Sequence, residues 1–477
     1  MAKPQFLITS DRSREIIVVL IGLGIHLWYL FHTTFVDWPE MILYPWFLSK
    51  GLLYYRDIVL AYVPGAYYLL FVLYKLFGFT VSSERIIAYG LILLTDVLVY
   101  CLSSTLTRNK WISGISLAFF IFWQPILSGN TIWYETILAP IYLGTLFFVL
   151  WYLNKPTIHK ALYIGLMLAL ASLIKQTAVW SIALVCLFIW LSNRKKIVGF
   201  HQALMIGVIP LVANLLVWAY FAVLGAGNEF GYWAYGFLFQ LSHASSDYML
   251  PPSRGDIILI IPAFIPIIIV MLLSRKSRII LLVCFWVIAL IMAGLPRWGL
   301  HRLQPALAFS SIGVALFIKE IIRQDIKRIF ISFCLICFMA VGSWRSFRLF
   351  ITVRDHMQPK FFTTTYDRLL KIIQAHQGKS FYILGNFDYL YFGMDRRPSV
   401  LPWVPLFPWN AQVPGMQERL IASLEKQKVQ NIFYMPFHGN KGYYLDYVPN
   451  TLLLYILSKY EKISALPVEA GWLFVRK

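Results

Sequence analysis

The chain alternates long apolar runs with short polar segments, and this pattern predicts a protein that crosses a membrane many times. About 20 consecutive apolar residues are needed to span a hydrocarbon core of about 30 Å. About eleven such spans can be placed along the first three quarters of the chain. They are predicted at 16–35, 85–106, 111–127, 136–153, two within 161–191, 200–224, one ending at 275, 279–295, one ending near 319 and 329–344.

Composition and charge agree with this pattern and exclude a soluble protein. The chain is 59% hydrophobic and 13% charged, with a mean hydropathy of +0.67, whereas soluble domains carry about 25% charged residues. The net charge of +20 does not indicate nucleic-acid binding, because Lys and Arg gather in short clusters between apolar runs, as the positive-inside rule requires. Since Lys3, Arg12 and Arg14 precede the first span, the N-terminus is predicted to be cytoplasmic.

The segment between the first two spans has a different pattern. Residues 36–78 are too polar at their start to cross a bilayer and too aromatic for an ordinary hydrated loop. Two helices lying along the membrane interface are predicted at 41–50 and 64–77. The second is short for a span, and counting it as one would place the later basic clusters on the wrong side.

The composition changes near residue 348, where charge rises and long apolar runs stop. Short buried strands are predicted at 380–384, 431–435 and 472–475, and a helix at 414–426. The predicted fold is therefore a polytopic, all-α membrane bundle of about eleven helices over 1–347, followed by a small extracytoplasmic α/β domain over 348–477. A multi-pass protein of the plasma or inner membrane follows from this organisation.

The cysteines indicate neither a disulfide framework nor a metal site. All five lie in apolar segments, where small buried thiols pack as apolar side chains. Cys334 and Cys337 form a CxxC motif, but it lies inside an apolar run without a second pair.

Three acidic residues are candidates for acid–base chemistry. Asp37 and Glu40 follow the first span beside Trp38 and Pro39, and Glu135 follows Trp133 in a short outer loop. Partial desolvation raises the pKa of a carboxylate and makes it a better base. The alternative is structural, because acidic residues also favour helix starts. These three acids could hold a divalent metal, and no cofactor follows from the sequence with certainty.

Basic residues outside the basic clusters are candidates for binding a phosphate. Lys175 interrupts an apolar pair of spans, where an ionisable group is costly and therefore functional by default; the alternative is a lysine that reaches the surface. Arg297, His301 and Arg302 share one outer turn. Two arginines and a histidine that converge in this way suit a phosphate.

Other polar residues have simpler interpretations. Arg56 and Asp57 follow Tyr55 and are expected to form a local ion pair or a turn. Asp96 lies inside a predicted span and needs a partner there. His26, in the first span, is interpreted as a packing residue whose ring finds a local partner.

Residues 36–78 are called the first outer segment below. The order of the motifs in this segment, together with three later motifs, resembles that of integral-membrane GT-C glycosyltransferases. The resemblance is to bacterial family 39-like proteins, protein O-mannosyltransferases and aminoarabinose transferases. Its elements are Asp37, Gly51, Tyr55-Arg56-Asp57, Pro64-Gly65-Ala66-Tyr67, Leu76-Phe77-Gly78, Trp133-x-Glu135, Lys175-Gln176 and the turn from Pro296 to Pro305.

The resemblance implies a polyprenyl-phosphate-linked sugar as the donor and the bilayer as a partner. In these families the first outer loop carries an Asp-Glu pair whose Asp is the catalytic base. Asp37 matches that Asp, and Trp38 stands where the Glu is expected. A lysine that these families carry before the Pro-Gly is replaced here by Tyr62-Val63, so Lys175, Arg297 and Arg302 become the candidates for the donor phosphate.

The sequence therefore predicts a glycosyltransferase that acts on the extracytoplasmic face with inversion at the sugar carbon. Asp37 is the expected base, Glu40 and Glu135 are further acidic candidates, and Tyr55, Arg56 and Asp57 are expected to support the loop. The acceptor is a protein, a lipid or a glycan. Two alternatives remain open at this stage: a transporter or flippase of a lipid-linked sugar or other anionic solute, and a non-catalytic scaffold or sugar-binding module.

Overall fold

The computed structural model describes residues 10–477 in two compact units. It leaves out 193–196, 238–250, 274–275, 295–296, 322–339, 346, 349–360, 362, 377–379, 386, 406–407, 436–448 and 469–470. The first unit comprises Met1–Val36, Arg85–Val212 and Pro252–Gln358. The second comprises Asp37–Glu84, Ala213–Pro251 and Pro359–Lys477. Contacts therefore group the first outer segment with the C-terminal part of the chain, and the predicted domain boundary at 347/348 stays a prediction.

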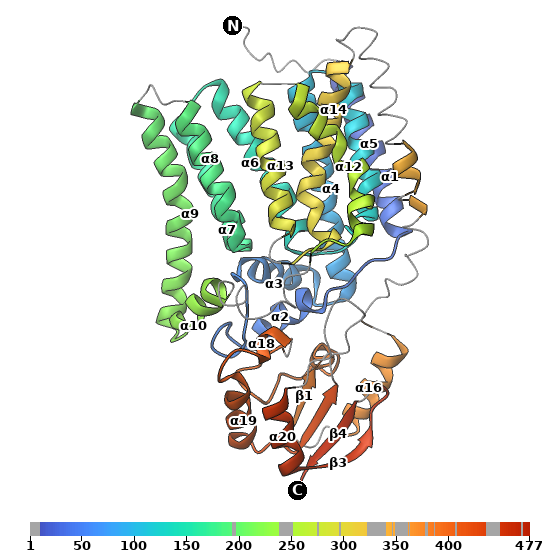
Figure 1. Cartoon of the computed structure of the whole chain (residues 1–477), viewed down its shortest axis with the longest axis vertical. Coiled ribbons are helices and arrows are strands. Elements are labelled where there is room, and N and C mark those ends of the chain that lie inside the picture. The colour runs from blue at the N-terminus through green and yellow to red at the C-terminus, as the bar shows by residue number, and fades with distance from the viewer. Residues whose placement is uncertain are drawn as a thin grey trace. The chain divides into compact units, whose positions relative to one another are not determined.

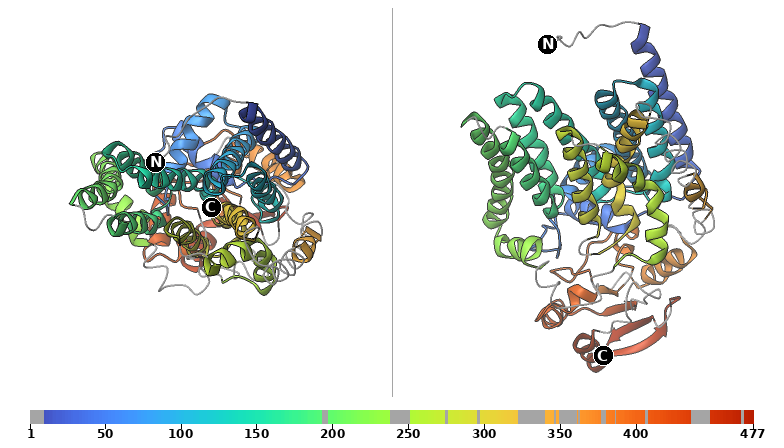
Figure 2. Two further views of the ribbon diagram at one scale, coloured as in Figure 1. Left: turned by 90° about the horizontal axis from the view of Figure 1, so that it is seen from above. Right: turned by 45° about the horizontal axis from the view of Figure 1, so that its top comes forward.

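The first unit is a bundle of apolar helices. In the view of Figure 1, α7 and α8 lie on its left, α1 and α5 on its right, and α14 between them; Figure 2 shows the helices end-on. Helices suit a bilayer because every backbone polar group is satisfied within the segment. The helices are α1 (Ser10–Phe31), α4 (Val81–Thr107, in this unit from Arg85), α5 (Lys110–Ile126), α6 (Tyr134–Asn154), α7 (Ile158–Ile174), α8 (Val179–Ser192), α9 (Ile197–Val223, in this unit up to Val212), α12 (Arg254–Leu273), α13 (Ser277–Gly294) and α14 (Gln304–Ile321).

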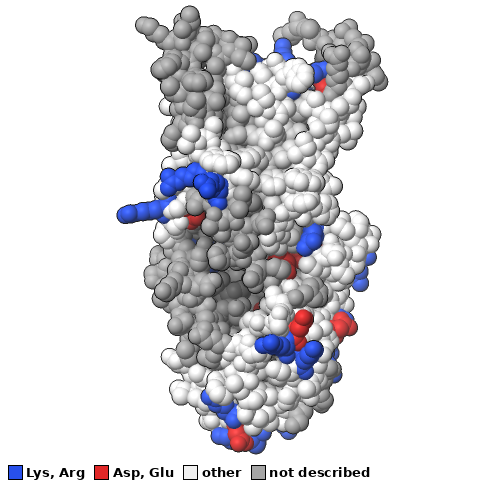
Figure 3. Space-filling view, turned by 90° about the vertical axis from the view of Figure 1, so that its right-hand side faces the viewer, with Lys and Arg blue, Asp and Glu red and all other residues white. Residues whose placement is uncertain are grey.

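Several of these helices are long and apolar enough to cross a membrane. Among the described residues there are five: Val81–Thr107, Tyr134–Asn154, Phe200–Val223, Arg254–Leu272 and Ser277–Gly294. On the face drawn in Figure 3, the upper part carries few charged side chains among its described atoms. The chain is therefore a multi-pass membrane protein. The count of eleven spans stays a prediction, and most of the span expected at 329–344 lies outside the described residues.

The centre of the first unit is built around α14, which packs against α5, α6, α12 and α13. Small side chains on α14 let these neighbours approach. Ser116 on α5 donates a hydrogen bond to the carbonyl of Ser311 over 2.6 Å, and Ser310 donates to the carbonyl of Ala263 over 2.5 Å. Such short polar contacts between helices are typical of packing in membranes, where burial of apolar surface gives no driving force.

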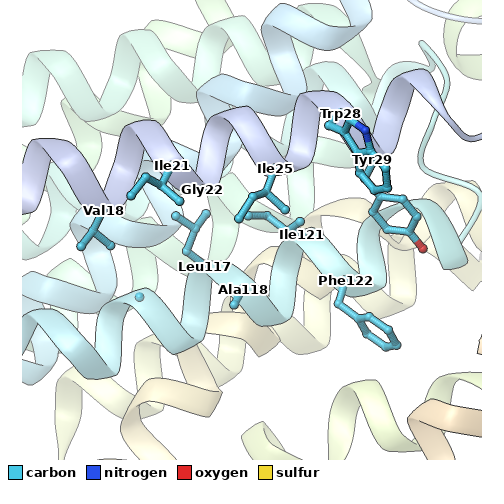
Figure 4. Close-up of a pocket in the computed structure, with 11 residues that line it drawn as sticks. Val18, Ile21, Gly22, Ile25, Trp28, Tyr29, Leu117, Ala118, Ile121 and Phe122 are labelled. Atoms are coloured by element: carbon cyan, nitrogen blue, oxygen red, sulfur yellow. The ribbon is translucent and has the colours of Figure 1, made fainter.

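An apolar groove runs between α1 and α5, with a volume of about 440 Å³. Figure 4 shows it lined by Val18, Ile21, Ile25, Trp28 and Tyr29 of α1 and by Leu117, Ala118, Ile121 and Phe122 of α5. A β-carbon on Gly22 would lie 2.6 Å from the Leu117 side chain. The two helices are therefore packed as closely as the glycine allows at this point of the groove.

The second unit contains the two short helices of the first outer segment, α2 (Pro39–Ser49) and α3 (Gly65–Phe77). Both helices predicted in this segment are present, within two residues of their expected bounds, and their position along the membrane interface stays a prediction. With 13 residues, α3 is about 20 Å long, which is shorter than the hydrocarbon core of a bilayer. Their aromatic side chains pack with residues far along the chain; Trp403, for example, contacts the rings of Tyr44 and Phe47 and pairs through its backbone with Ile58.

The C-terminal part of the second unit contains a four-stranded sheet in the order β1-β2-β4-β3. Strands β1 and β2 are parallel, and the other pairs are antiparallel. In Figure 1, α19 and α20 lie on the left of the sheet and α16 on its right. The elements are α16 (Thr364–Gln374), β1 (Phe381–Gly385), α19 (Met416–Lys426), β2 (Asn431–Met435), α20 (Asn450–Lys459), β3 (Tyr460–Ala465) and β4 (Trp472–Arg476). The fold is thus mainly helical with a small C-terminal sheet, as predicted.

Candidate active site

Asp37 is buried in the second unit, with 1% of its surface exposed. It does not cap the helix that follows, because the residue at the N-cap of α2 is Trp38. Instead, its Oδ2 accepts a hydrogen bond from the backbone N–H of Phe361 over 3.2 Å. This contact joins residues 324 positions apart, so the C-terminal part of the chain fixes the orientation of the carboxylate that the sequence marks as the base.

Three carboxylates of the second unit act on two buried tyrosines, Tyr389 and Tyr44. Burial and then the charges of Asp388, Asp37 and the neighbouring Tyr366 raise the pKa of Tyr389. Burial raises the pKa of Tyr44 as well, and among the charges that add to this effect are those of Glu40 and Asp388. These phenols therefore stay neutral and available as hydrogen-bond donors. Asp37, Glu40 and Asp388 form an acidic patch in the second unit.

Tyr55, Arg56 and Asp57 form a turn. Arg56 donates to Asp57 over 2.8 and 3.1 Å, and Asp57 also accepts the Leu53 N–H over 2.9 Å. Burial works to raise the pKa of Asp57, but these donors lower it below its ordinary value. The Tyr55 hydroxyl donates to the carbonyl of Tyr62 over 2.6 Å. The local ion pair expected from the sequence is therefore present, while the supporting role of the three residues in catalysis stays a prediction.

Glu135 and Lys175 form a buried ion pair in the first unit. Glu135 lies in the first turn of α6, and Lys175 lies directly after the end of α7. Their side chains are 2% and 4% exposed, and the lysine Nζ donates to Oε1 of the glutamate. The second oxygen, Oε2, has no hydrogen-bond partner among the described residues. A buried pair of this kind is retained at a desolvation cost, so it needs an explanation beyond stability.

The turn between α13 and α14 brings further cationic groups to this ion pair. Arg302 is buried and its Nη1 donates to the carbonyl of Arg297 over 2.6 Å. The His301 ring stands edge-on to Trp133, with 5.6 Å between the ring centres. Burial, followed by the charges of Arg302, Lys175 and Arg297, holds the pKa of His301 well below its usual 6.5. The other three basic candidates therefore all act on His301 within the first unit.

This cationic cluster can bind an anion. It contains Lys175, Arg302 and Arg297 against one carboxylate, Glu135, with a neutral histidine whose N–H can donate. Charge-assisted bonds from arginine to phosphate are roughly twice as strong as neutral ones, and exclusion of water strengthens them further. The sequence predicted Arg297, His301 and Arg302 as one turn and Glu135 and Lys175 as separate candidates, and the structure brings the two groups together. Their roles stay predictions.

Sequence reasoning missed two residues that help to build these sites. Phe361 contributes only its backbone N–H, which no side-chain pattern can reveal. Asp388 was overlooked although it follows the carboxyl end of β1 by three residues, a position where α/β sheets often place functional side chains. Among the described residues, no group of three or more His, Cys, Asp and Glu side chains is placed to hold a metal ion.

The low pKa of His301 predicts a loss of stability in acid. Below pH 6.5 the unfolded chain binds a proton at this residue and the folded protein does not, so stability falls as the pH falls towards the lowered folded pKa. One such group costs about 1.4 kcal/mol per pH unit in that window. We expect the unfolding temperature of His301→Gln in detergent to drop less between pH 7.5 and 5.5 than that of the unsubstituted protein. Equal drops would contradict this prediction.

No protein-family model matches the chain, and no curated protein sequence matches it. Solved structures do. ArnT from Cupriavidus metallidurans bound to undecaprenyl phosphate matches with a TM-score of 0.58, at 12% identity, over 96% of this chain and 97% of that one. Its apo state gives a TM-score of 0.59 at 11% identity over 98% of both chains. The archaeal oligosaccharyltransferase AglB from Archaeoglobus fulgidus, in complex with an inhibitory peptide and a dolichol-phosphate, gives 0.54 at 11% identity over 89% of this chain and 70% of that one.

The similarity to ArnT extends over nearly the whole of both chains, and it therefore includes the bundle, the short helices of the first outer segment and the C-terminal sheet. At identities of 11–12% a likeness of this extent concerns the fold. It agrees with the order of motifs in the first outer segment. The chain has the fold of the GT-C membrane glycosyltransferases.

Proposed function

We propose that this protein transfers a sugar from a polyprenyl-phosphate donor to a hydroxyl acceptor on the extracytoplasmic face of the cell membrane. The observation that carries the proposal is the buried cationic cluster of the first unit. Lys175 comes from the end of α7, His301 and Arg302 come from the turn between α13 and α14, and Arg302 is only 7% exposed. Burying like charges together is costly, and an anionic ligand would offset that cost.

The solved structures support the choice of ligand. The ArnT structure was determined with undecaprenyl phosphate, and the AglB structure with a dolichol-phosphate. In both cases a phosphate group is attached to a long isoprenoid chain. A membrane protein with the same fold and a buried cationic cluster is suited to a ligand of this chemistry, whose tail remains in the apolar phase.

The proposed reaction is a single inverting displacement. Asp37 accepts the proton of the acceptor hydroxyl, and the oxygen forms a bond to the anomeric carbon of the sugar. The bond between that carbon and the phosphate oxygen breaks, and its electron pair leaves with the lipid phosphate. General-base assistance is worth roughly 10²–10⁴-fold in rate. The cationic cluster stabilises the charge on the leaving group, an effect of similar or greater size in a water-excluded site.

The acidic patch of the second unit supports the role of Asp37. Its Oδ2 is held by the Phe361 N–H, so the carboxylate keeps one orientation, as a general base must. Glu40 and Glu135 are assigned secondary roles: Glu40 helps to bind acceptor hydroxyls, and Glu135 holds Lys175 until the phosphate arrives. Tyr55, Arg56 and Asp57 keep the first outer segment in shape.

The experiment that tests this proposal follows both bond cleavage and transport. Purified protein in liposomes would be incubated with polyprenyl phosphates that carry radiolabelled hexoses or pentoses, and with a membrane extract as the source of acceptors. We expect release of free polyprenyl phosphate together with transfer of the label to an acceptor. Movement of intact donor across the bilayer would instead support a flippase, and saturable binding without either event would support a scaffold. Both results would contradict glycosyl transfer.

A further inference from the structure

The membrane part of the first unit contains a buried polar chain that the proposed reaction does not use. His26 of α1 lies with its Nδ1 2.7 Å from Oδ2 of Asp96 in α4, and both side chains are fully buried. The Nε2 of the same ring lies 3.4 Å from Oε1 of Gln124 in α5. Ionisable groups inside a bilayer are costly and are retained where they have a function. His26 is therefore the partner within the membrane that the sequence predicted for Asp96.

The direction of these hydrogen bonds follows from the amide of Gln124. Its Nε2 donates to the carbonyl of Gly129 over 2.6 Å, so a flipped amide would set two oxygens against each other. Oε1 therefore faces His26, and the ring must donate from Nε2. This holds whether the proton shared with Asp96 lies on the ring or on the carboxyl group. In both arrangements the pair is electrically neutral, and Asp96 fixes the orientation of the ring.

Gln124 in turn closes the loop between α5 and α6. The N–H of Gly129 donates back to the backbone carbonyl of Gln124 over 3.0 Å. A β-carbon at position 129 would lie 2.5 Å from the side-chain nitrogens of both Gln124 and Gln304, so only glycine fits. Gln304, the first residue of α14, donates to the carbonyl of Leu127 over 3.1 Å. Two glutamine amides therefore hold the turn from both sides.

The other end of the loop is attached to the end of α1. Asn130 donates to the carbonyls of Leu30 and Thr33 over 3.0 and 3.1 Å. Thr131 donates to the carbonyl of Val36 over 2.5 Å and pairs with it through the backbone. The loop then continues directly into Trp133, which contacts His301, and into Glu135, which pairs with Lys175.

We infer that His26, Asp96 and Gln124 are positioning residues that hold the loop between α5 and α6, and through it Trp133 and Glu135, in the arrangement required by the cationic cluster. The link to catalysis rests on the proposed function, whereas the control of the loop does not. The polar chain runs from the interior of the bundle to the turn at Gly129 through consecutive hydrogen bonds. A fixed supporting shell of this kind is what keeps functional groups within about 0.5 Å of their productive geometry.

The test measures the loop directly. Hydrogen exchange of the amides in 127–133 would be followed by mass spectrometry on protein in lipid nanodiscs. Gln124→Leu removes both hydrogen bonds of the amide, and Asp96→Leu releases the His26 ring. We expect both variants to speed exchange in the loop by about tenfold or more, because local opening sets the rate. Asp96→Asn should stay within about threefold, because its amide can donate to Nδ1 and leave the proton on Nε2.

Ser103 provides the matched control. Its hydroxyl contacts that of Ser116 over 2.8 Å between the same two helices, α4 and α5, and it is fully buried. In the described part of the chain, no hydrogen bond joins the side chain of Ser103 to Gln124 or Gly129. Ser103→Ala should leave exchange in the loop unchanged. Unchanged exchange in Gln124→Leu and Asp96→Leu, or an equal increase in Ser103→Ala, would overturn the inference. If Gln124→Leu does not fold, Asp96→Leu against Asp96→Asn decides by itself.

Sugar transfer gives a second readout that can fail separately. In the same series we expect the lowest kcat in the variants whose loop exchanges hydrogen fastest. The kcat of Asp96→Asn should stay close to that of the unsubstituted protein. A protein that folds but transfers no sugar would leave the exchange result standing, and would count against the proposed function alone. Fast loop exchange with full transfer activity would instead remove the link between the loop and catalysis.

Discussion

Asp37→Asn is expected to reduce sugar transfer by about 10²–10⁴-fold, the contribution of a positioned general base. Asparagine has almost the same shape as aspartate, and its Oδ1 can still accept the Phe361 N–H that now reaches the carboxylate over 3.2 Å. It cannot accept a proton from a hydroxyl. The loss should therefore appear in kcat, with binding of the donor nearly unchanged. Steady-state transfer rates and the unfolding temperature of purified variants provide the measurement.

The control for this substitution is Asp395→Asn. Asp395 belongs to the same unit and pairs with Lys50 over 2.6 Å, but its side chain is 74% exposed, and exposed pairs contribute about 1 kcal/mol or less. Its transfer rate should stay within about twofold of the unsubstituted protein. Retention of more than a third of the activity in a folded Asp37→Asn variant would exclude Asp37 as the base and direct attention to Glu40 and Asp388.

The bundle could be predicted because its signal is local. A run of apolar residues indicates a span without reference to the rest of the chain, and Lys175 was correctly placed between two helices, at the end of α7. In the same way, the short apolar run at 64–77 indicated that α3 is too short to be a span. Helix ends were less predictable. The first helix ends at Phe31, four residues before the expected end, because Asn130 takes the carbonyls of Leu30 and Thr33.

The sheet shows where local patterns stop being informative. Strands β1, β2 and β4 were predicted within one residue because they are buried and apolar. Strand β3 was missed because five of its six residues are exposed and its sequence, YEKISA, resembles a polar loop. It is held only by its pairing with β4, and a pairing partner is not visible in the strand's own sequence.

The candidate sites depend on contacts between distant positions. The sequence indicated that Asp96 needs a partner and that Lys175 is costly where it lies, because charged groups inside a bilayer are costly. It did not indicate which partners they have. The contact between Asp96 and His26 spans 70 positions, and that between Asp37 and Phe361 spans 324. The residue type indicates that a buried charged group requires a partner, whereas the packing of the chain decides which residue is that partner.

Lys175→Met is expected to be the most destabilising single substitution at the candidate site. It would leave the Glu135 carboxylate buried, at 2% exposure, without its cation. Removing one partner of a buried ion pair costs about 3–5 kcal/mol, because the remaining charge loses its compensation. Glu135→Gln should cost less: Arg302 and Lys175 then repel each other without the carboxylate, but the neutral amide can still accept a hydrogen bond from the lysine and no unpaired carboxylate is left. Free energies of unfolding in mixed detergent micelles would measure both.

The double variant Glu135→Gln/Lys175→Met separates the ion pair from its surroundings. We expect it to be more stable than Lys175→Met alone by about 2 kcal/mol or more, since no unpaired carboxylate remains. The pair Lys276–Glu320 of the same unit is the control: it spans 3.3 Å with the lysine 63% exposed, and a double-mutant cycle there should give about 1 kcal/mol or less. Equal coupling energies for the two pairs would mean that Glu135 and Lys175 are hydrated, and a hydrated cluster would lose its advantage in binding the phosphate of a lipid.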